Sequence, residues 1–320
     1  MKYIFSSHFK EHIRGLVDQK HLLGYPYEES ERILYNFDQF CIKNFDTEVN
    51  LTKEIGLAWA QINHSEKNNS FRNRLMPIRE LARYMNRIGI EAYIIPVDLV
   101  KKGQRYIPHI YTKEELSSFF NVLDQIPYKR KFPLRHLVIP VIFRVIYCCG
   151  LRPSEARKLK VCNVNLKNGR LNILESKGHK DRVVILADDV LDLCKKYYKV
   201  KQLIFPQSEY FFPSSDGSMY TKGWMEKTFR ICWVNTGIQR SRGNPPRVYD
   251  FRHTFATNRL YKWLNEGKDL TACLPYLSAY MGHAQLSDTA YYIHLVPEFF
   301  PQMAQMDINK FECLIPEVEQ

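Results

Sequence analysis

RLNILESKGHKDRVVILA, residues 170–187, decides the fold class, because it holds two short β-type runs in a chain that is otherwise patterned for helices. The runs RLNILES (170–176) and DRVVILA (181–187) are separated by KGHK, and this spacing with a glycine in the turn predicts a β-hairpin. Apolar residues at three- and four-residue spacing predict helices on both sides of it, over 112–125, 134–150, 222–237, 250–265, 270–281 and 287–294. The predicted fold class is therefore mainly α with a small β-sheet.

The first hundred residues are also patterned for helices. Apolar periodicity is clear over 29–45 and 70–88, and Pro77 is expected to limit or kink the second helix near its start. Basic residues at steps of four predict an exposed stripe on the opposite side of that helix. Such a stripe either tracks DNA phosphates or is a solvated face, and its members are Arg79, Arg83 and Arg87.

A basic linker divides the chain. The stretch KKGQRYIPHI (101–110) contains a glycine and a proline, and Thr112 with Glu115 then forms a capping-box signature for a new helix. We therefore predict a domain boundary here, with one helical domain over 1–108 and a second domain over 109–320. Three linker residues are candidate DNA contacts, namely Lys101, Lys102 and Arg105.

The charge indicates a polyanionic partner, because 46 Lys and Arg face 34 Asp and Glu and the formal net charge is +12. The excess is concentrated: residues 112–294 carry +13, residues 1–111 carry +3 and residues 295–320 carry −4. Evenly solvated lysines are the alternative explanation. A hydrophobic content of 45% and an aromatic content of 13% exclude a disordered, collagen-like or low-complexity chain.

Cysteine use and hydropathy favour a cytoplasmic protein. The eight cysteines form no CxxC pair and no Cys/His ligand spacing, which is typical of reduced thiols. The most apolar run, 137–151, is too short to span a bilayer and is interrupted by Arg144. The beginning, MKYIFSSHFK, lacks the apolar core of a secretory signal.

Four segments hold the residue types that carry chemistry. Taken singly they have ordinary explanations: Arg152 can form a salt bridge with Glu155, and Lys177 can be a solvated turn residue. These residues become informative when they are taken together, because they occur along the chain in the order Arg, Lys, Arg, His, Tyr. The segments are YCCGLRPSEARKLK (147–160), ESKGHKDRVVIL (175–186), YDFRHTFAT (249–257) and MGHAQLSDTAYYIHL (281–295).

These motifs closely resemble those of the tyrosine recombinase (phage integrase) family. The resemblance covers about residues 112–295, and it includes a spacing of nine positions from His283 to Tyr292. This spacing selects Tyr292 over its neighbour Tyr291. The N-terminal segment is similar to the family's core-binding domain only in length and character. The resemblance therefore implies a two-domain clamp on DNA, with a helical DNA-binding domain over 1–108 and a catalytic domain over 109–320.

The resemblance implies a role for each motif residue. Tyr292 attacks the scissile phosphate and forms a 3′-phosphotyrosyl link, which stores the energy of the broken bond. Arg152 and Arg252 clamp the non-bridging oxygens, Lys177 protonates the leaving 5′ oxygen, and His283 donates a hydrogen bond to the phosphate. No metal or cofactor is required for this chemistry.

The sequence departs from the family at one position. The family's histidine three residues before the second arginine is replaced by Tyr249, whose ordinary pKa near 10 makes it a poor base. His253 is expected to buttress the site rather than to replace that histidine, because adjacent helical residues point about 100° apart. Glu155 is expected to orient the active-site cations.

The implied function is site-specific DNA recombination, such as integration or excision, by an enzyme encoded by a prokaryote or a mobile element and acting at the nucleoid. Double-stranded DNA is the implied partner, and a homotetramer, or a complex with related recombinases, on two DNA sites is the implied assembly. The tail 295–320 either docks on a neighbouring subunit or packs on its own chain. A catalytically impaired accessory member and a type IB topoisomerase-like nicking-closing enzyme are the alternatives.

Overall fold

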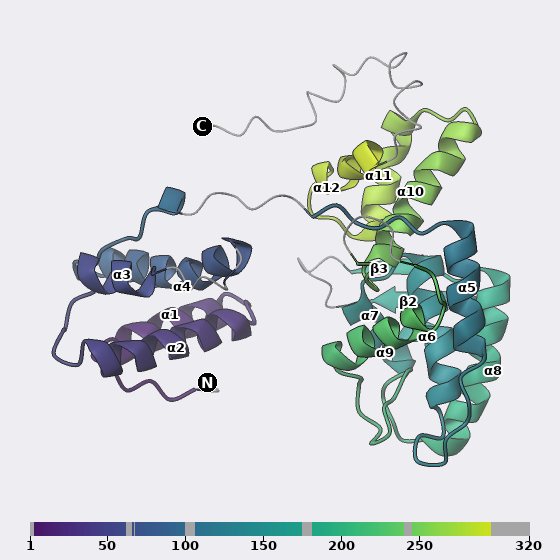
Figure 1. Ribbon diagram of the computed structural model, residues 1–320, viewed down its shortest axis with the longest axis horizontal. Helices are drawn as coiled ribbons and strands as arrows, with labels where there is room; N and C mark the ends of the chain where they lie inside the picture. The colour runs from purple at the N-terminus through teal and green to yellow at the C-terminus, as the bar shows by residue number, and fades with distance from the viewer. Residues whose placement is uncertain are drawn as a thin grey trace. The chain divides into compact units, whose positions relative to one another are not determined.

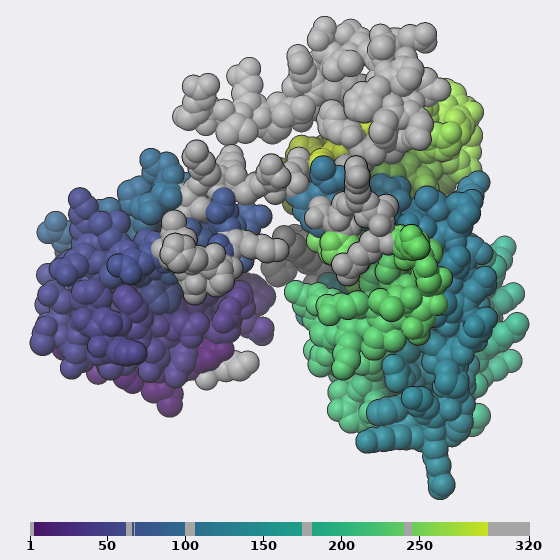
Figure 2. Space-filling view, in the orientation of Figure 1, coloured from purple at the N-terminus to yellow at the C-terminus, as the bar shows by residue number. Residues whose placement is uncertain are grey.

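The chain folds into helices and one small three-stranded sheet (Figure 1). The computed structural model describes residues 3–61, 66, 68–99, 106–174, 181–239 and 245–295. Contacts divide the chain into two units, Met1–Tyr106 and Ile107–Gln320. Figure 2 shows one face of the surface of each unit, coloured by residue number. Across the described ranges, no helix has both the length and the hydropathy needed to cross a membrane.

The first unit is a bundle of helices around an aromatic and aliphatic core. Phe9, Phe37 and Leu75 are fully buried in it. Pro77 does not limit the second predicted helix, which begins at Asn68 and contains the proline in its interior. The elements are α1 (Lys10–Leu22), α2 (Glu28–Asn44), α3 (Lys53–Trp59), α4 (Asn68–Arg87) and the short 3₁₀ helix η1 (Val97–Leu99).

The predicted arginine stripe on α4 is wrong for Arg79. Its side chain is only 7% exposed, its Nε donates to the carbonyl oxygen of Ile95 at 2.8 Å, and its Nη2 donates to the carbonyl oxygen of Pro96. Position 79 lies four residues after buried Leu75 and three before buried Ala82, so it shares their face. Arg79 therefore ties α4 to the following segment and is not available to contact DNA.

The second unit confirms the predicted helices of the catalytic domain. The predicted capping box is present, since Thr112 Oγ1 accepts from the Glu115 amide at 3.2 Å and Glu115 accepts from the Thr112 amide at 2.9 Å. One long helix, α8 (Asp188–Ile204), was not predicted. The other helices are α5 (Lys113–Asp124), α6 (Arg135–Cys149), α7 (Pro153–Lys158), α9 (Lys222–Val234), α10 (Asp250–Asn265), α11 (Leu270–Met281) and α12 (Ser287–Ala290), with 3₁₀ helices η2 (Val161–Asn163) and η3 (Tyr291–Leu295).

The predicted hairpin is present as strands β2 (Arg170–Ile173) and β3 (Arg182–Ile185), which pair antiparallel. A third strand, β1 (Val164–Asn165), adds to the β2 edge. Ile173 pairs directly with Arg182. Because directly paired residues share a face of the sheet, and Ile173 is buried, Arg182 points to the buried face.

Two apolar clusters hold the second unit together. The larger surrounds α6, whose residues Ile139, Ile142 and Phe143 are buried against neighbouring helices. The smaller joins α10, α11 and η3, and it includes Tyr292. Figure 1 shows α10, α11 and α12 side by side at one end of this unit. The end of α11 and the start of α10 therefore meet the α6–α7 turn.

Candidate active site

The predicted site begins at the turn between α6 and α7. Gly150 ends α6 in the left-handed region (φ 60°), and a Cβ at this position would lie 2.5 Å from Phe255 Cδ1. Only glycine fits such a turn without strain. The turn places Arg152 at the N-cap of α7. Its Nη2 donates to the carbonyl oxygen of Gly282 at 2.9 Å, so the Arg152 side chain spans from α7 to the end of α11.

Arg252 lies in the first turn of α10 and is fully buried. Its Nη1 donates to the carbonyl oxygen of Gly150 at 2.6 Å, and its Nη2 donates to that of Met281. Both acceptors lie at helix C-terminal ends, where backbone carbonyls lack intrahelical partners and favour a cation. Burial, followed by the charge of Arg152, lowers the pKa of Arg252 to about 10, so it stays charged at neutral pH.

The buried Nε of Arg252 has no hydrogen-bond partner among the described residues. A buried donor in this condition is uncommon and calls for an occupant. The two carbonyl bonds use two of the five N–H groups of the guanidinium. Arg252 can therefore bind an anion without giving up the contacts that hold it.

Glu155 is the carboxylate of the site, and its main partner is a residue that the sequence analysis missed. Arg182 donates to both oxygens of Glu155, at 2.9 and 2.8 Å, and Arg152 Nη1 donates to one of them at 2.7 Å. Burial favours the neutral carboxyl, but hydrogen bonds and charge from Arg182, then from Arg152, outweigh it and lower the pKa of Glu155 to about 2. The expected salt bridge of Arg152 with Glu155 is thus present within this larger cluster.

His283 follows Gly282, which ends α11 in the left-handed region (φ 64°). The His283 Nδ1 is 2.7 Å from the hydroxyl of buried Thr289. Burial, followed by the charges of Arg252 and Arg152, lowers the pKa of His283 to about 3. The imidazole is therefore neutral at physiological pH, when it can still donate one hydrogen bond.

Tyr292 lies in the smaller apolar cluster, with 3% of its surface exposed. Its ring stacks on His283 with a centroid distance of 6.0 Å. Burial raises the pKa of Tyr292 to about 12, against the lowering effect of Arg252. The phenol is neutral at rest, so a reaction through it must remove its proton. Tyr291 is half-buried beside it, with ring centroids 6.2 Å apart.

Tyr249 and His253 lie one turn apart at the start of α10. The ring centroid of His253 is 5.2 Å from that of Tyr249 and 5.5 Å from that of Tyr292. Tyr249 is 38% exposed. Burial, followed by the charges of Arg247 and Arg252, lowers the pKa of His253 to about 4. A neutral imidazole thus packs against Tyr292, in line with the predicted buttressing position.

The structure brings together Arg152, Glu155, Arg252, His283 and Tyr292 from distant parts of the sequence. Lys177 and the linker candidates Lys101, Lys102 and Arg105 lie outside the described residues. Arg83 and Arg87 are exposed on α4 of the first unit. In the part of the chain that the structure describes, no three or more His, Cys, Asp or Glu side chains are placed to hold a metal ion.

A groove of about 950 Å³ adjoins the arginine cluster. Its walls come from α7, α9 and the segment before α10, and it reaches Ser154 and Tyr249 beside the cluster. Among the described residues, four basic side chains and one acidic side chain, Glu226, line it. The basic ones are Arg157, Lys222, Arg230 and Arg247. The described lining is therefore mainly positive, and it includes residues that lie close to Arg152 and Arg252 in the sequence.

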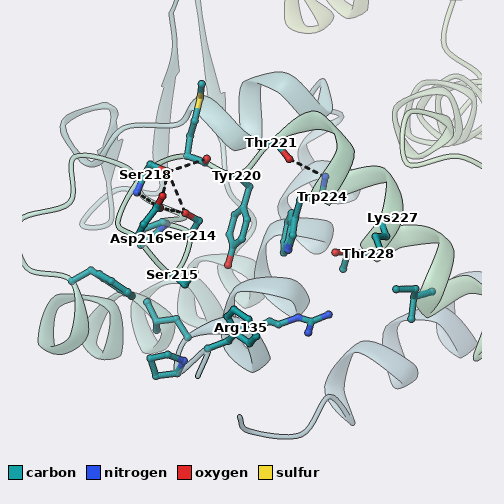
Figure 3. A pocket seen from close by; sticks show the side chains of 17 residues that line it. Arg135, Ser214, Ser215, Asp216, Ser218, Tyr220, Thr221, Trp224, Lys227 and Thr228 are labelled. Atoms are coloured by element: carbon teal, nitrogen blue, oxygen red, sulfur yellow. Dashed lines mark hydrogen bonds between the residues drawn. The ribbon is translucent and has the colours of Figure 1, made fainter. Parts of the chain in front are cut away.

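A smaller cavity of about 380 Å³ lies elsewhere in the same unit (Figure 3). The rings of Tyr220 and Trp224 stack in it with centroids 3.5 Å apart. Asp216 accepts from the amide and hydroxyl of Ser218 at 3.0 and 2.7 Å. The residues known to line it neither belong to the arginine cluster nor adjoin it in the sequence, unlike Pro153 and Ser154 of the larger groove, so we assign it no part in the chemistry.

The fold and this cationic cluster around a tyrosine define a class of phosphoryl-transfer enzyme that acts through a covalent intermediate. The sequence profile of the phage integrase family matches residues 110–298, more than half of the chain. The chain therefore belongs to the phage integrase family, the tyrosine recombinases. It is an enzyme of the kind that cleaves and rejoins DNA strands, as the motifs implied.

Relatives and solved structures agree with this assignment. The chain is 29% identical over 302 residues to the integrase/recombinase y4rB of Sinorhizobium fredii, covering 92% of this chain and 96% of that protein. It is 28% identical over 195 residues to the tyrosine recombinase XerC of Proteus mirabilis, covering 61% and 57%. Its fold is similar to XerH recombinase bound to a palindromic difH substrate, with a TM-score of 0.64 at 21% identity over 87% and 78% of the two chains. The Tn1549 transposon integrase in complex with transposon right-end DNA gives 0.62 at 14% identity over 94% and 99%.

Proposed function

We propose that Tyr292 is the nucleophile of a site-specific recombinase. Its phenolic oxygen attacks the scissile phosphorus, a P–O bond to tyrosine forms, and the P–O bond to the 5′ oxygen breaks. The phenol proton passes to water during attack, and the 5′ oxygen gains a proton, which Lys177 supplies by resemblance. Reversal by a 5′-hydroxyl of another strand rejoins the DNA without an external energy source.

The observation that carries this proposal is the unpartnered Nε of buried Arg252. Arg152 and Arg182 both pair with the carboxylate of Glu155, whereas Arg252 donates to backbone carbonyls, so the cluster keeps an excess of positive charge. A scissile phosphate between Arg152 and Arg252 would neutralise that excess and satisfy the buried donor. The charge on the phosphate grows in the transition state, so a fixed pair of guanidiniums stabilises that state more than the ground state.

Double-stranded DNA is the proposed substrate, and two observations support it. The structural neighbour XerH was solved bound to difH DNA, and a basic groove of this chain is lined by Ser154, which lies between Arg152 and Glu155 in the sequence. We propose that four protomers act on two DNA sites and that the enzyme works on nucleoid DNA in the cytoplasm. Arg83, Arg87, Lys101, Lys102 and Arg105 remain proposed phosphate contacts of residues 1–108.

Trapping a covalent protein–DNA complex tests the proposal. A duplex that the full-length protein binds is first selected from a pool of random-sequence duplexes, which requires binding alone. Copies of it are then nicked at successive positions, so that cleavage next to a nick releases a short fragment and blocks religation. We expect an adduct that survives boiling in detergent and is destroyed by protease.

The accessory-protein alternative rests on Tyr249, which replaces the family's usual histidine. It would be favoured if the protein binds the selected duplex but forms no adduct with any nicked copy. A topoisomerase-like enzyme would instead relax supercoiled plasmids that lack the selected sequence. Strand exchange between two copies of the selected sequence supports the recombinase.

The general-acid role of Lys177 gives a separate prediction. A 5′-bridging sulfur at the scissile position leaves as a thiolate without needing a proton. Lys177→Ala is expected to slow cleavage of ordinary DNA by about 100- to 10,000-fold and to cleave the 5′-thio duplex at nearly the wild-type rate. Gel assays of adduct formation measure both. A similar loss on both duplexes would rule out this role.

The tail makes a prediction about assembly. Its net charge is −4, and its apolar residues include Phe299, Phe300, Met303, Met306, Phe311 and Leu314. If it docks on a neighbouring subunit, deletion of 300–320 will abolish strand exchange between two duplexes while leaving affinity for one duplex within about 3-fold. Band-shift titration and recombination of paired duplexes measure the two effects. Unchanged recombination would instead favour a tail that packs on its own chain.

A further inference from the structure

Arg182 is the residue of the cluster that neither the motifs nor the proposed roles use. It lies on β3, and only 6% of its side chain is exposed. Its two Nη groups donate to the two oxygens of Glu155 at 2.9 and 2.8 Å, while its Nε donates to the carbonyl oxygen of Tyr280 at 2.8 Å. All three nitrogens of the guanidinium are thus engaged within the protein. Arg182 is held as a fixed part of the site, not as a free surface cation.

The surroundings of Arg182 are built to accommodate it. A Cβ on Gly282 would lie 3.2 Å from both Cδ and Nη1 of Arg182, so a larger residue there would crowd the side chain. The carbonyl oxygen of the same glycine accepts from Arg152 Nη2. Arg182 and Arg152 therefore pack on opposite parts of one glycine and share one carboxylate. Displacing either side chain disturbs the position of the other.

Glu155 has enough acceptor capacity to hold both arginines, but it holds them differently. Arg182 takes both oxygens in a bidentate pair, whereas the Arg152 side chain takes Oε1 alone through Nη1, and the Arg152 backbone amide donates to Oε2 at 2.8 Å. The bidentate geometry is the stronger of the two side-chain contacts. Without Arg182, the buried carboxylate keeps its contacts with Arg152 but loses one of its two cationic partners, so its charge would draw the remaining guanidinium, that of Arg152, towards both oxygens. A bidentate grip on Arg152 would turn its donors away from an incoming phosphate.

We propose that Arg182 is a positioning residue for DNA cleavage. By pairing with both oxygens of Glu155, it limits the Arg152 side chain to its single contact through Nη1. The remaining donors of Arg152 then stay available for the scissile phosphate. This inference rests on the proposed function, because it assumes that Arg152 binds the phosphate. It adds one residue to the machinery and gives the carboxylate a defined task. Arg182 itself touches no substrate.

Three substrates separate this role from a merely structural one. The first is the selected duplex with an ordinary phosphate at the scissile position. The second carries a methylphosphonate there, which removes one negative charge and so reduces the need for an arginine clamp. The third carries the 5′-bridging sulfur, which removes the need for a general acid. Adduct formation is measured for wild type, Arg182→Met, Arg182→Lys and Arg152→Ala on each.

We expect Arg182→Met to slow cleavage of the ordinary duplex by about 100-fold, as misplacement of a catalytic group does. On the methylphosphonate the loss should shrink to under about 10-fold, in parallel with Arg152→Ala. On the 5′-thio duplex the loss should persist. Arg182→Lys keeps the charge but not the fork, so it should fall between wild type and Arg182→Met.

Glu155→Gln provides a second, independent measurement. If Arg182 acts through Glu155, the losses from Arg182→Met and Glu155→Gln will not add, and the double variant will cleave no more slowly than Arg182→Met alone. Arg144→Met is the matched control, because it also removes an arginine that pairs with a carboxylate, Asp124. It should stay within about 2-fold of wild type. Circular dichroism checks that each variant is folded.

Several outcomes would overturn the inference. An equal loss on all three duplexes means that Arg182 only supports the fold, and rescue on the 5′-thio duplex alone means that it serves the general acid. Wild-type cleavage by a folded Arg182→Met would also reject it. If the wild-type protein binds the duplex but forms no adduct, the proposed function is wrong, and this inference, which rests on it, is wrong as well. If the wild-type protein forms adducts but the Arg182 variants do not show the expected differences among the three duplexes, only the role of Arg182 is rejected.

Discussion

Tyr292→Phe is expected to form no covalent complex with a nicked duplex, a loss of more than about 1,000-fold, while Tyr291→Phe still forms one. The substitution removes the nucleophilic oxygen and nothing else. Burial raises the pKa of Tyr292 to about 12, and Arg252 is the largest opposing influence. The same guanidinium that would bind the phosphate is thus close enough to favour the phenolate as attack proceeds.

The fold gives this experiment a clean control. Phenylalanine fills the same space in the apolar cluster of α10, α11 and η3, so thermal stability should change by less than about 1 kcal/mol. Duplex binding should also persist. The matched variant Tyr291→Phe removes a neighbouring hydroxyl whose ring centroid is 6.2 Å from that of Tyr292. If Tyr292→Phe still forms the adduct, or if only Tyr291→Phe fails to form it, the nucleophile is Tyr291 and not Tyr292.

Arg252→Lys is expected to reduce cleavage by about 100- to 1,000-fold even though it keeps the charge. Arg252 donates to two backbone carbonyls and still offers Nε, because its five donors are fixed in one plane. An ammonium has three donors at one point. It cannot satisfy the carbonyl oxygens of Gly150 and Met281 and also clamp a phosphate.

The control for that variant lies on the same helix. Arg259 of α10 sits over the ring of Trp263, with a distance of 5.9 Å from its Cζ to the ring centroid. Arg259→Lys keeps a cation there and should stay within about 2-fold of wild type. Adduct formation is the readout, with duplex binding measured in parallel. Cleavage by Arg252→Lys at the wild-type rate would show that the fork of Arg252 is not needed.

Local periodicity was enough to predict most elements of the second unit, but it missed α8. This helix has a regular apolar face that includes Val190, Leu191, Cys194 and Tyr197. The face ends on Lys201, which is fully buried and donates through Nζ to the carbonyl oxygen of Ser208 at 2.8 Å. A lysine in an apolar position interrupts the pattern, and its partner is seven residues away in a loop. The sequence could not reveal that bond before the loop was placed.

Arg79 and Arg182 show the same limit for function. Both are charged residues on buried faces, and their partners come from other elements. For Arg182 a signal did exist, since strand alternation puts it on the face of buried Val184, where a cation must have a partner. For Arg79, the spacing of four residues from Leu75 and of three from Ala82 likewise indicates a place on the buried face of its helix.

The members of the cluster that were expected from the sequence could be selected because their motifs, in their order along the chain, resemble those of the phage integrase family. The groups that hold these side chains in place could not be predicted in this way. The groups that hold Arg152 and Arg252 are backbone carbonyls of Gly150, Met281 and Gly282. A carbonyl has no signature in the sequence, and only the two glycines hint that the backbone turns there.

These carbonyl contacts also determine when the enzyme becomes able to cut. Arg152 donates to the carbonyl oxygen of Gly282, which lies 130 positions further along the chain. The carbonyl oxygen of Gly150 accepts from Arg252, which lies 102 positions later. During synthesis, a chain emerging from the ribosome would therefore hold the first arginine and the hairpin long before the C-terminal end of α11 exists to fix them. The arginine cluster cannot form until the C-terminal end of α11 has been made, because the carbonyl oxygens of Met281 and Gly282 accept from Arg252 and Arg152. A chain truncated before the end of α11 therefore lacks contacts that hold both arginines.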